Sequence, residues 1–404
     1  MGYRFTLDDV TFLRTPQGLD ALDDAARLDF SASSILADIG HVRSRCAPHD
    51  GAVVETILCR RRGRAKLRAA DDMLFTDDAL QQATPSAVAR RRAEEISARL
   101  PGAVVHDLTC SIGAELMELS RQEGISGVIG SDVDRVRLAM ARHNTALDGG
   151  RATLLAADAL TSTSSADIVL ADPGRRAGSS RVFRLDQLTP PLLDLLDVCS
   201  GRPAAVKCAP GLDYRMFRDT YGFVGQVQIT SLDGAVREAC LWTERDGEPA
   251  QRATVLRTDA DGSVRSFDVT DHEPDDVAVG EVGEWIIDPD GAIVRAGLVR
   301  NFAHRHGLWQ LDPRIAYLTG DTVPPGERGF RVLEVAGVAD KELRKRLTAL
   351  DCGSLEILVR GLDIDPDRLR KRLKPKGSRP LALVLTRIGR KGVALICEPG
   401  VRVP

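Results

Sequence analysis

The sequence predicts an α/β protein in which a parallel sheet ends in an antiparallel hairpin, with a helical region before it and an α+β region after it. Three observations support this prediction. Short apolar runs alternate with helical patterns between residues 86 and 210, which is typical of a parallel sheet covered by helices. Two alternating runs joined by Asp233-Gly234 then predict a hairpin. The last 75 residues follow the order β-α-β-α-β-β.

The length of 404 residues exceeds what one hydrophobic core usually supports, so we expect several domains. We place them at 1–85 (helical), 86–245 (the sheet and its hairpin), 246–329 (a mixed α/β connecting region) and 330–404 (the basic α+β unit). No run reaches the roughly 18 apolar residues of a membrane helix, and the N-terminus lacks the pattern of a signal peptide. We therefore expect a cytoplasmic protein that does not act at a membrane.

The cysteines and histidines show no spacing typical of a metal site. None of the eight cysteines forms a Cys-x-x-Cys pair, so we expect buried, reduced thiols. His304 and His306 share a helical stretch, but residues two apart do not share a helix face. The sequence predicts no metal.

The elements follow in order along the chain. Apolar residues at helical spacing predict helices between 19 and 46, and a further helix at 88–100 leads into the sheet. The strands are expected at 103–108, 126–132, 152–158, 166–172 and 203–209, and the helices between them at 112–124, 134–149 and 185–199. The hairpin strands are 224–232 and 235–244, and one helix is expected at 293–307.

Four consecutive strands end on an aspartate: Asp107, Asp132, Asp158 and Asp172. Ligands of open α/β sheets bind at the carboxyl ends of the strands, so we expect these carboxylates to line one site. Gly113 is the one glycine in the loop after the first of these strands, whereas a nicotinamide site favours three.

Asp132 lies nineteen residues after Gly113, where a carboxylate can accept both ribose hydroxyls. Asp134 is a competitor, although it is better placed to cap the next helix. Asp158 can accept the adenine amino group.

Over residues 86–245, the order of strands, helices and strand-end aspartates resembles that of the class I S-adenosylmethionine-dependent methyltransferases. These enzymes have a Rossmann-like sheet with an antiparallel final strand. The resemblance implies S-adenosylmethionine as cofactor. It implies cofactor-binding roles for Asp107, Thr109, Cys110 and Gly113 of the first motif, for Asp132 and Asp158, and for Gln82 and Thr84, which precede the first helix. An N-cap role alone also explains Thr84.

The stretch "IVLADPGRRAG" at 168–178 matches the fourth motif of that family. The resemblance implies that Asp172 orients the acceptor, Pro173 fixes the loop and Arg175 positions a base or a phosphate. Amino-nitrogen methyltransferases have Asp-Pro-Pro and an aromatic residue here, whereas this sequence has Gly174 and Arg175. Arg176 is a candidate phosphate contact, and pairing of both arginines with surface carboxylates is the alternative.

The same stretch also resembles the Asp-Pro-Pro-Arg-x-Gly motif of uracil-C5 RNA methyltransferases, which need a cysteine nucleophile. Cys208 stands after the fifth strand, and Lys207 beside it can favour a thiolate or contact the substrate. The Ser-Cys-Asn-Pro run of that family is absent, and a cysteine in a strand is more often part of the core.

The C-terminal region is basic. Residues 341–404 hold sixteen Lys/Arg against seven Asp/Glu, a local charge of +9, whereas the whole chain has −3. With the stretch "DPDRLRKRLKPKGSRP", the region resembles the THUMP-like domain of a bacterial methyltransferase family associated with RNA modification. The candidate RNA contacts are Arg368, Arg370, Lys371, Arg372, Lys374, Lys376 and Arg379. A solvated helix face is the alternative.

Together these features predict a methyltransferase that acts on a base in structured RNA, either tRNA or rRNA. Methylation of a protein or a small molecule is one alternative, in which the basic region is incidental. A non-catalytic RNA-binding protein that retains the cofactor fold is another.

Overall fold

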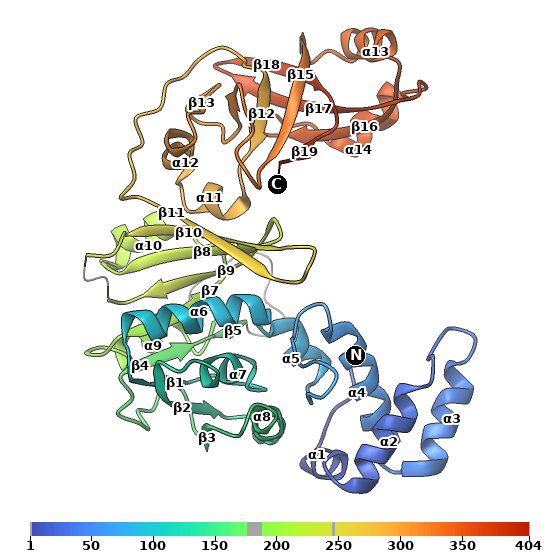
Figure 1. The fold of residues 1–404 in the computed structure, drawn as a ribbon, viewed down its shortest axis with the longest axis vertical. Coiled ribbons are helices and arrows are strands. Elements are labelled where there is room, and N and C mark those ends of the chain that lie inside the picture. Colours follow the sequence, from blue (N-terminus) through green and yellow to red (C-terminus); the bar gives the residue numbers. More distant parts are fainter. Residues whose placement is uncertain (1, 176–187, 245–246, 404) are drawn as a thin grey trace. The chain divides into compact units, whose positions relative to one another are not determined.

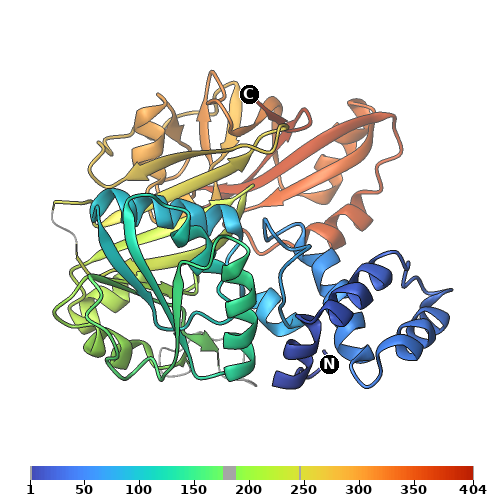
Figure 2. The same ribbon diagram turned by 60° about the horizontal axis from the view of Figure 1, so that its bottom comes forward.

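The computed structural model describes residues 2–175, 188–244 and 247–403. The chain divides into two compact units, Met1–Val227 with Arg237–Asp246 and Gln228–Val236 with Gly247–Pro404. Figure 1 labels most of the helices and strands of both units, and Figure 2 shows the same ribbon turned by 60°.

Five helices form the N-terminal part of the first unit. They are α1 (Leu7–Leu13), α2 (Pro16–Ala26), α3 (Ile35–Cys46), α4 (Asp50–Gly63) and α5 (Asp77–Gln82). Threonine hydroxyls accept backbone N–H groups at the starts of α1, α2 and α5, as N-caps do. The helical expectation for this region is confirmed.

The N-terminal helices share one hydrophobic core with residues of the sheet region, including Ile112, Met117 and Met140. Asn144 connects the two parts, because its buried side-chain amide accepts the Leu74 N–H at 2.7 Å and donates to the carbonyls of Leu74 and Ile112. A buried amide satisfied at three points fixes the backbone on both sides of it. The N-terminal helices are therefore packed against the loop that contains Ile112, between β1 and α7.

The sheet of the first unit has the strand order β9-β7-β4-β1-β2-β3. Its strands are β1 (Ala103–Asp107), β2 (Ile125–Asp132), β3 (Ala152–Ala156), β4 (Ile168–Ala171), β7 (Ala204–Cys208) and β9 (Ala235–Trp242). Neighbouring strands are parallel except for β9, which is antiparallel to β7. This is the Rossmann-like sheet with an antiparallel final strand that the sequence predicts.

The helices of the sheet region are α6 (Ser86–Arg99), α7 (Ala114–Ser120), α8 (Arg135–Ala146), α9 (Leu192–Val198) and α10 (Tyr214–Tyr221). Helix α9 begins later than the prediction of 185, with Pro191 as its N-cap, because proline fixes the first turn of a helix and disfavours helical backbone just before it. The prediction missed α10, which Asp213 caps. It also missed the short pair β5 (Gly174–Arg175) and β6 (Leu188–Thr189).

The predicted turn at Asp233-Gly234 connects β8 (Gln226–Leu232) to β9. Both turn residues have positive φ, 54° for Asp233 and 80° for Gly234. A type I′ turn requires positive φ at its two central residues, which aspartate and glycine tolerate best.

The second unit contains β10 (Gln251–Thr258) and β11 (Val264–Thr270), which pair antiparallel. A larger sheet has the order β13-β14-β12-β15-β18-β17-β16, with β19 beside β15. These strands are β12 (Trp285–Asp288), β13 (Trp309–Gln310), β14 (Leu318–Gly320), β15 (Arg328–Gly337), β16 (Cys352–Val359), β17 (Arg379–Ile388), β18 (Lys391–Cys397) and β19 (Val401–Arg402). The β-α-β-α-β-β order predicted for the C-terminal region is confirmed.

The helices of the second unit are α11 (Gly291–Arg295), α12 (Val299–Arg305), α13 (Asp340–Ala349) and α14 (Pro366–Leu373). The single helix expected at 293–307 is wrong. Gly297 has a φ of +75° between α11 and α12, a left-handed conformation that ends a helix.

No helix in the described parts of the chain combines the length and the apolar character that a membrane crossing requires. Among the same residues, no group of three or more His, Cys, Asp or Glu side chains is arranged to hold a metal ion.

Candidate active site

The four strand-end aspartates line one cavity of about 390 Å³ in the first unit. Asp107 ends β1, Asp132 ends β2, and Asp158 and Asp172 follow β3 and β4. They come together because the carboxyl ends of neighbouring parallel strands meet at one edge of the sheet. Of the other residues predicted to bind the cofactor, the cavity is also lined by Gln82, Thr84, Thr109 and Cys110.

The loop between β1 and α7 lines the cavity at this edge of the sheet. Ser111 and Gly113 both have positive φ, 48° and 78°. A Cβ on Gly113 would lie 3.3 Å from the side chains of Ala141 and Thr145 on α8. Gly113 does not line the cavity itself, so its role is to let the loop turn closely against α8.

Backbone groups hold the carboxylate of Asp132 in place. One oxygen accepts the Ser111 N–H at 2.9 Å and the other accepts the Asp134 N–H at 2.8 Å. An ionised carboxylate has about four acceptor positions, so each oxygen can accept one more hydrogen bond. The prediction that Asp134 caps the next helix is confirmed, because its side chain accepts the N–H groups of Val136 and Arg137.

Asp107 is the most deeply buried of the four aspartates. Burial raises its pKa to about 7, although its hydrogen bond from the Thr109 N–H opposes the shift, and the nearby carboxylates of Glu115 and Asp172 add to it. The Thr109 hydroxyl oxygen also accepts the Asp172 N–H at 2.6 Å. Thr109 therefore connects the end of β1 to the loop after β4.

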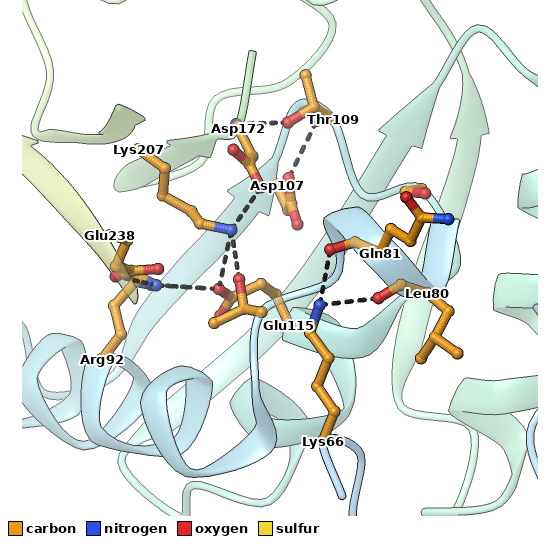
Figure 3. A network of polar contacts seen from close by, with 12 residues as sticks. Lys66, Leu80, Gln81, Arg92, Asp107, Thr109, Glu115, Asp172, Lys207 and Glu238 are labelled. Atoms are coloured by element: carbon orange, nitrogen blue, oxygen red, sulfur yellow. Dashed lines mark hydrogen bonds and ion pairs between the residues drawn. The ribbon is translucent and has the colours of Figure 1, made fainter. Parts of the chain in front are cut away.

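Lys207 reaches the same edge from β7, and Figure 3 shows its ammonium group between three oxygen-bearing side chains. Its Nζ lies 2.5 Å from Asp172 Oδ2 and 3.8 Å from Glu115 Oε1, and it donates a hydrogen bond to Thr84 Oγ1. Burial lowers the pKa of Lys207, but the carboxylates of Asp172, Glu115 and Glu238 outweigh burial and hold it above its usual value. Lys207 is therefore a buried cation.

A second buried cation, Arg92 of α6, completes the cluster. It donates to Glu115 Oε1 at 3.2 Å and lies 2.6 Å from Glu238 Oε1 of β9 (Figure 3). Burial raises the pKa of both glutamates, but Arg92 and Lys207 bring that of Glu115 below its usual value, whereas that of Glu238 stays raised. Buried charges persist only where opposite charges surround them.

The N-cap explanation of Thr84 is wrong. Helix α6 begins at Ser86 with Pro85 as its N-cap and without a side-chain capping bond, because proline itself presets the helical start. The Thr84 hydroxyl instead accepts a hydrogen bond from Lys207. The segment before Thr84 is held by Lys66, whose Nζ donates to the carbonyls of Leu80 and Gln81, each at 2.8 Å.

Of the fourth motif, Asp172 lines the cavity. Pro173 is buried beside Asp172 and is not among the lining residues. Arg175 belongs to β5, and Arg176 lies outside the described residues. The candidate RNA contacts of α14 and the loop after it belong to the second unit.

The cysteine alternative does not fit the site. Cys208 is buried in β7 and is not among the residues that line the cavity, whereas its neighbour Lys207 is. Successive side chains of a strand point to opposite faces. Burial and the nearby groups Cys240 and Asp172 raise the pKa of the Cys208 thiol, so the thiolate needed for attack on a pyrimidine is disfavoured.

Sequence reasoning missed Arg92, Glu115, Glu238, Lys66 and Arg137. Glu115 follows Gly113 of the first motif by two residues, so its position in the chain could have identified it as a candidate site residue. Arg137 also lines the cavity and lies 2.5 Å from Asp78 of α5. The other three come from segments that carry no motif, so no local signal identifies them.

The cavity suits a nucleoside that carries an amino acid. Its volume lies within the range of about 300–1,000 Å³ that small-molecule sites occupy. Asp132 accepts two backbone N–H groups and Asp158 accepts that of Leu160, so both carboxylates retain acceptor positions for hydroxyl and amino hydrogens. Asp107 lines the same cavity. The residues present therefore fit S-adenosylmethionine.

Comparisons with known proteins agree with this fit. Relatives from the CDC 1551 / Oshkosh and H37Rv strains of Mycobacterium tuberculosis are described as uncharacterized S-adenosylmethionine-dependent methyltransferases. Each is 49% identical over 370 residues, which cover 89% of this chain and 99% of the relative.

A crystal structure of a protein from Porphyromonas gingivalis W83, described as a "putative methyltransferase", matches the fold with a TM-score of 0.72. The two are 21% identical, and the match covers 98% of this chain and 99% of that chain. A family model described as THUMP domain-like matches residues 327–399, and a model of a domain of unknown function, DUF8688, matches residues 6–63.

The family, the fold class and the cofactor expected from the sequence are thereby confirmed. S-adenosylmethionine is the cofactor, and the strand edge with its aspartates is where this fold binds ligands. The protein belongs to the S-adenosylmethionine-dependent methyltransferases.

Proposed function

We propose that the protein transfers the methyl group of S-adenosylmethionine to a base in structured RNA, either tRNA or rRNA, in the cytoplasm. The observation that carries this proposal is the exposed basic surface of the THUMP-like region. Lys371, Lys374, Lys376 and Arg379 are all exposed there, and none of them forms an ion pair with another residue in the described parts of the chain. We refer to these four residues as the basic surface.

The remaining basic candidates are engaged with carboxylates. Arg370 lies 2.6 Å from Asp367, Arg372 lies 2.7 Å from Asp340, and Arg368 pairs with Asp365 at 3.5 Å. Exposed pairs of this kind contribute little to stability, so these arginines can exchange their partners for phosphates. The four residues of the basic surface need no exchange, which supports a polyanionic substrate.

In the active site, Asp132 would hold the ribose of the cofactor and Asp158 its adenine amino group. The bound cofactor supplies an activated methyl group on a sulfonium. Asp172 Oδ1 would be the oxygen that accepts from the substrate, since Oδ2 is bonded to Lys207 and none of the described residues donates to Oδ1. An acceptor that donates a hydrogen to Oδ1 would thereby present its lone pair to the methyl group.

A base N–H or exocyclic amino group fits this arrangement better than a pyrimidine carbon, since Cys208 is buried away from the cavity. Arg175 would position the base or a phosphate, and Pro173 would hold the loop. The THUMP-like region would bind the RNA through its basic surface, which raises the affinity without taking part in the chemistry.

The test is mass spectrometry of nucleosides from the RNA of a strain that lacks the gene. The proposal predicts that one methylated nucleoside disappears and returns when the purified protein and S-adenosylmethionine are added to that RNA. An unchanged nucleoside profile, together with methyl incorporation into protein or small molecules, would favour the alternative substrates. Normal cofactor binding without any incorporation would favour a non-catalytic RNA-binding protein.

A further inference from the structure

Lys207 is a charged side chain that is buried in a strand. It is the next-to-last residue of β7, at the carboxyl end of the strand, and only 9% of its side chain is exposed. An ammonium ion is costly to bury unless oxygen atoms replace its water. The contacts of Nζ therefore indicate the role of the side chain.

The ammonium group donates hydrogen bonds to Asp172 Oδ2 and Thr84 Oγ1, and it forms an ion pair with Glu115 Oε1 at 3.8 Å. Lys207 has three N–H bonds and no acceptor, and its Nζ faces Asp172, Thr84 and Glu115. The three partners belong to different segments, namely the loop after β4, the loop before α6, and the first turn of α7. Lys207 thus joins three segments that line one cavity.

Two other roles are disfavoured by the same contacts. A direct contact with the substrate RNA, which the sequence suggested, requires an accessible ammonium group, whereas this one is buried among its partners. A role as general base requires a neutral amine. The surrounding carboxylates instead favour the charged form of Lys207.

We propose that Lys207 is a positioning residue for methyl transfer, which holds Asp172 by Oδ2 so that Oδ1 faces the hydrogen of the acceptor. The proposal rests on the proposed role of Asp172, but it does not depend on the acceptor being RNA. Glu115 and Thr84 fix the ammonium group, and Arg92 with Glu238 fixes Glu115 (Figure 3). The carboxylate of Asp172, which is 43% exposed, then needs no other anchor on its buried side.

The test uses the full-length protein and four variants, K207M, K207R, D172N and the double variant D172N/K207M. Each is assayed with S-adenosylmethionine labelled in its methyl group. The acceptors are RNA purified from a strain that lacks the gene and, separately, a nuclease-treated extract of that strain. Calorimetry measures the cofactor affinity, and thermal melting verifies that each variant folds.

We expect K207M to lower kcat about 10- to 100-fold, because misplacing a reacting group by about 1 Å can cost about 100-fold. The cofactor affinity should change less than about threefold. K207R retains the charge and should recover part of kcat. In the D172N background, K207M should cost little more, because the group that Lys207 positions is already disabled.

The matched control is R257M in the second unit. Arg257 is also a largely buried cation, 2.5 Å from the buried carboxylate of Glu327. Its replacement should lower the melting temperature and leave kcat unchanged, which separates positioning from general destabilisation.

The proposal is overturned if K207M retains the kcat of the wild type, or if the losses from K207M and D172N simply multiply in the double variant. If K207M does not fold, K207R decides: full loss of kcat without rescue would contradict a role of the charge. Wild-type labelling of the nuclease-treated extract alone would refute the RNA substrate, and the variants would then be compared on that fraction.

Discussion

The buried cluster around Lys207 and the basic surface of the THUMP-like region both present lysine charges, but in opposite surroundings. Lys207 is enclosed by three oxygen-bearing partners, whereas Lys371, Lys374 and Lys376 are exposed. A buried charge is hardly screened by salt and acts through its geometry. Exposed charges act through their number, since each contributes a similar electrostatic term.

The two regions therefore respond differently to substitution. At the strand edge, a single substitution leaves a partner charge buried without compensation and should have a large effect. On the basic surface, a single substitution should have a small effect, and several should add.

Asp172→Asn should lower kcat by about 100-fold or more, because the neutral amide is a weaker hydrogen-bond acceptor than a carboxylate for the hydrogen of the methyl-accepting group. Lys207 keeps Glu115 as a buried counter-charge, so we expect the variant to fold. Single-turnover kinetics with bound cofactor measure the effect. A variant with unchanged kcat would remove Asp172 from the reaction, and an equal loss of cofactor affinity would assign it to cofactor binding instead.

Asp132→Ala should weaken cofactor binding by about 10- to 100-fold, because a hydrogen bond to a charged group contributes roughly 1.5–3 kcal/mol. Isothermal titration calorimetry measures the change. Asp134→Ala is the matched control, since it removes a carboxylate from the same loop and costs about 1 kcal/mol of helix capping. Equal losses in the two variants would show that loop stability, and not ribose recognition, is measured.

Replacing the four residues of the basic surface by glutamine should weaken RNA binding and flatten its salt dependence. Each lost phosphate contact is expected to reduce the slope of log affinity against log salt by about 0.7–0.9. Filter binding of RNA from the deletion strain at several salt concentrations measures this slope, and single replacements should each change it by one such step.

A matched control removes four exposed arginines from the N-terminal region. These are Arg4, Arg14, Arg27 and Arg43. The same loss of net charge there should leave the slope nearly unchanged. Equal slopes for both quadruple variants would mean that net charge alone, and no defined surface, attracts the RNA.

Asp107→Asn should change how the stability depends on pH. The unfolded carboxyl titrates near 3.8 and the folded one at about 7, so between these values the folded protein retains a proton that the unfolded chain loses. The free energy of unfolding of the wild type therefore falls as pH rises through this window, by up to about 1.4 kcal/mol per pH unit relative to the variant.

Urea unfolding of both proteins at pH 4.5, 5.5 and 6.5 measures this difference. Other groups with raised pKa values, such as Glu327, are present in both proteins and cancel. Parallel stability curves would contradict the burial effect on Asp107.

Much of the fold and one side of the site could be predicted from local patterns. Asp107, Asp132, Asp158 and Asp172 end consecutive strands, and parallel pairing brings strand ends together whatever the loops do. Asp134 was recognisable as a cap, and Asp233-Gly234 as a turn, because both effects act within a few residues.

The prediction failed where a local rule competed with a distant partner. The local sequence predicts Thr84 as an N-cap, but its hydroxyl accepts a hydrogen bond from Lys207, 123 residues later in the chain. The local sequence around Lys207 is equally typical of an exposed lysine near the end of a strand. Its burial depends on Glu115 and Glu238, which lie on α7 and β9.

Residue types and their spacings along the chain suffice for the order of strands and helices, the aspartates at the strand ends and the basic character of the C-terminal region. Which charges are buried together depends on the folded chain. The cluster of Lys207 and Arg92 with their carboxylates forms because packing excludes water from segments far apart in the chain, and an ion without water must find its partners wherever the fold brings them.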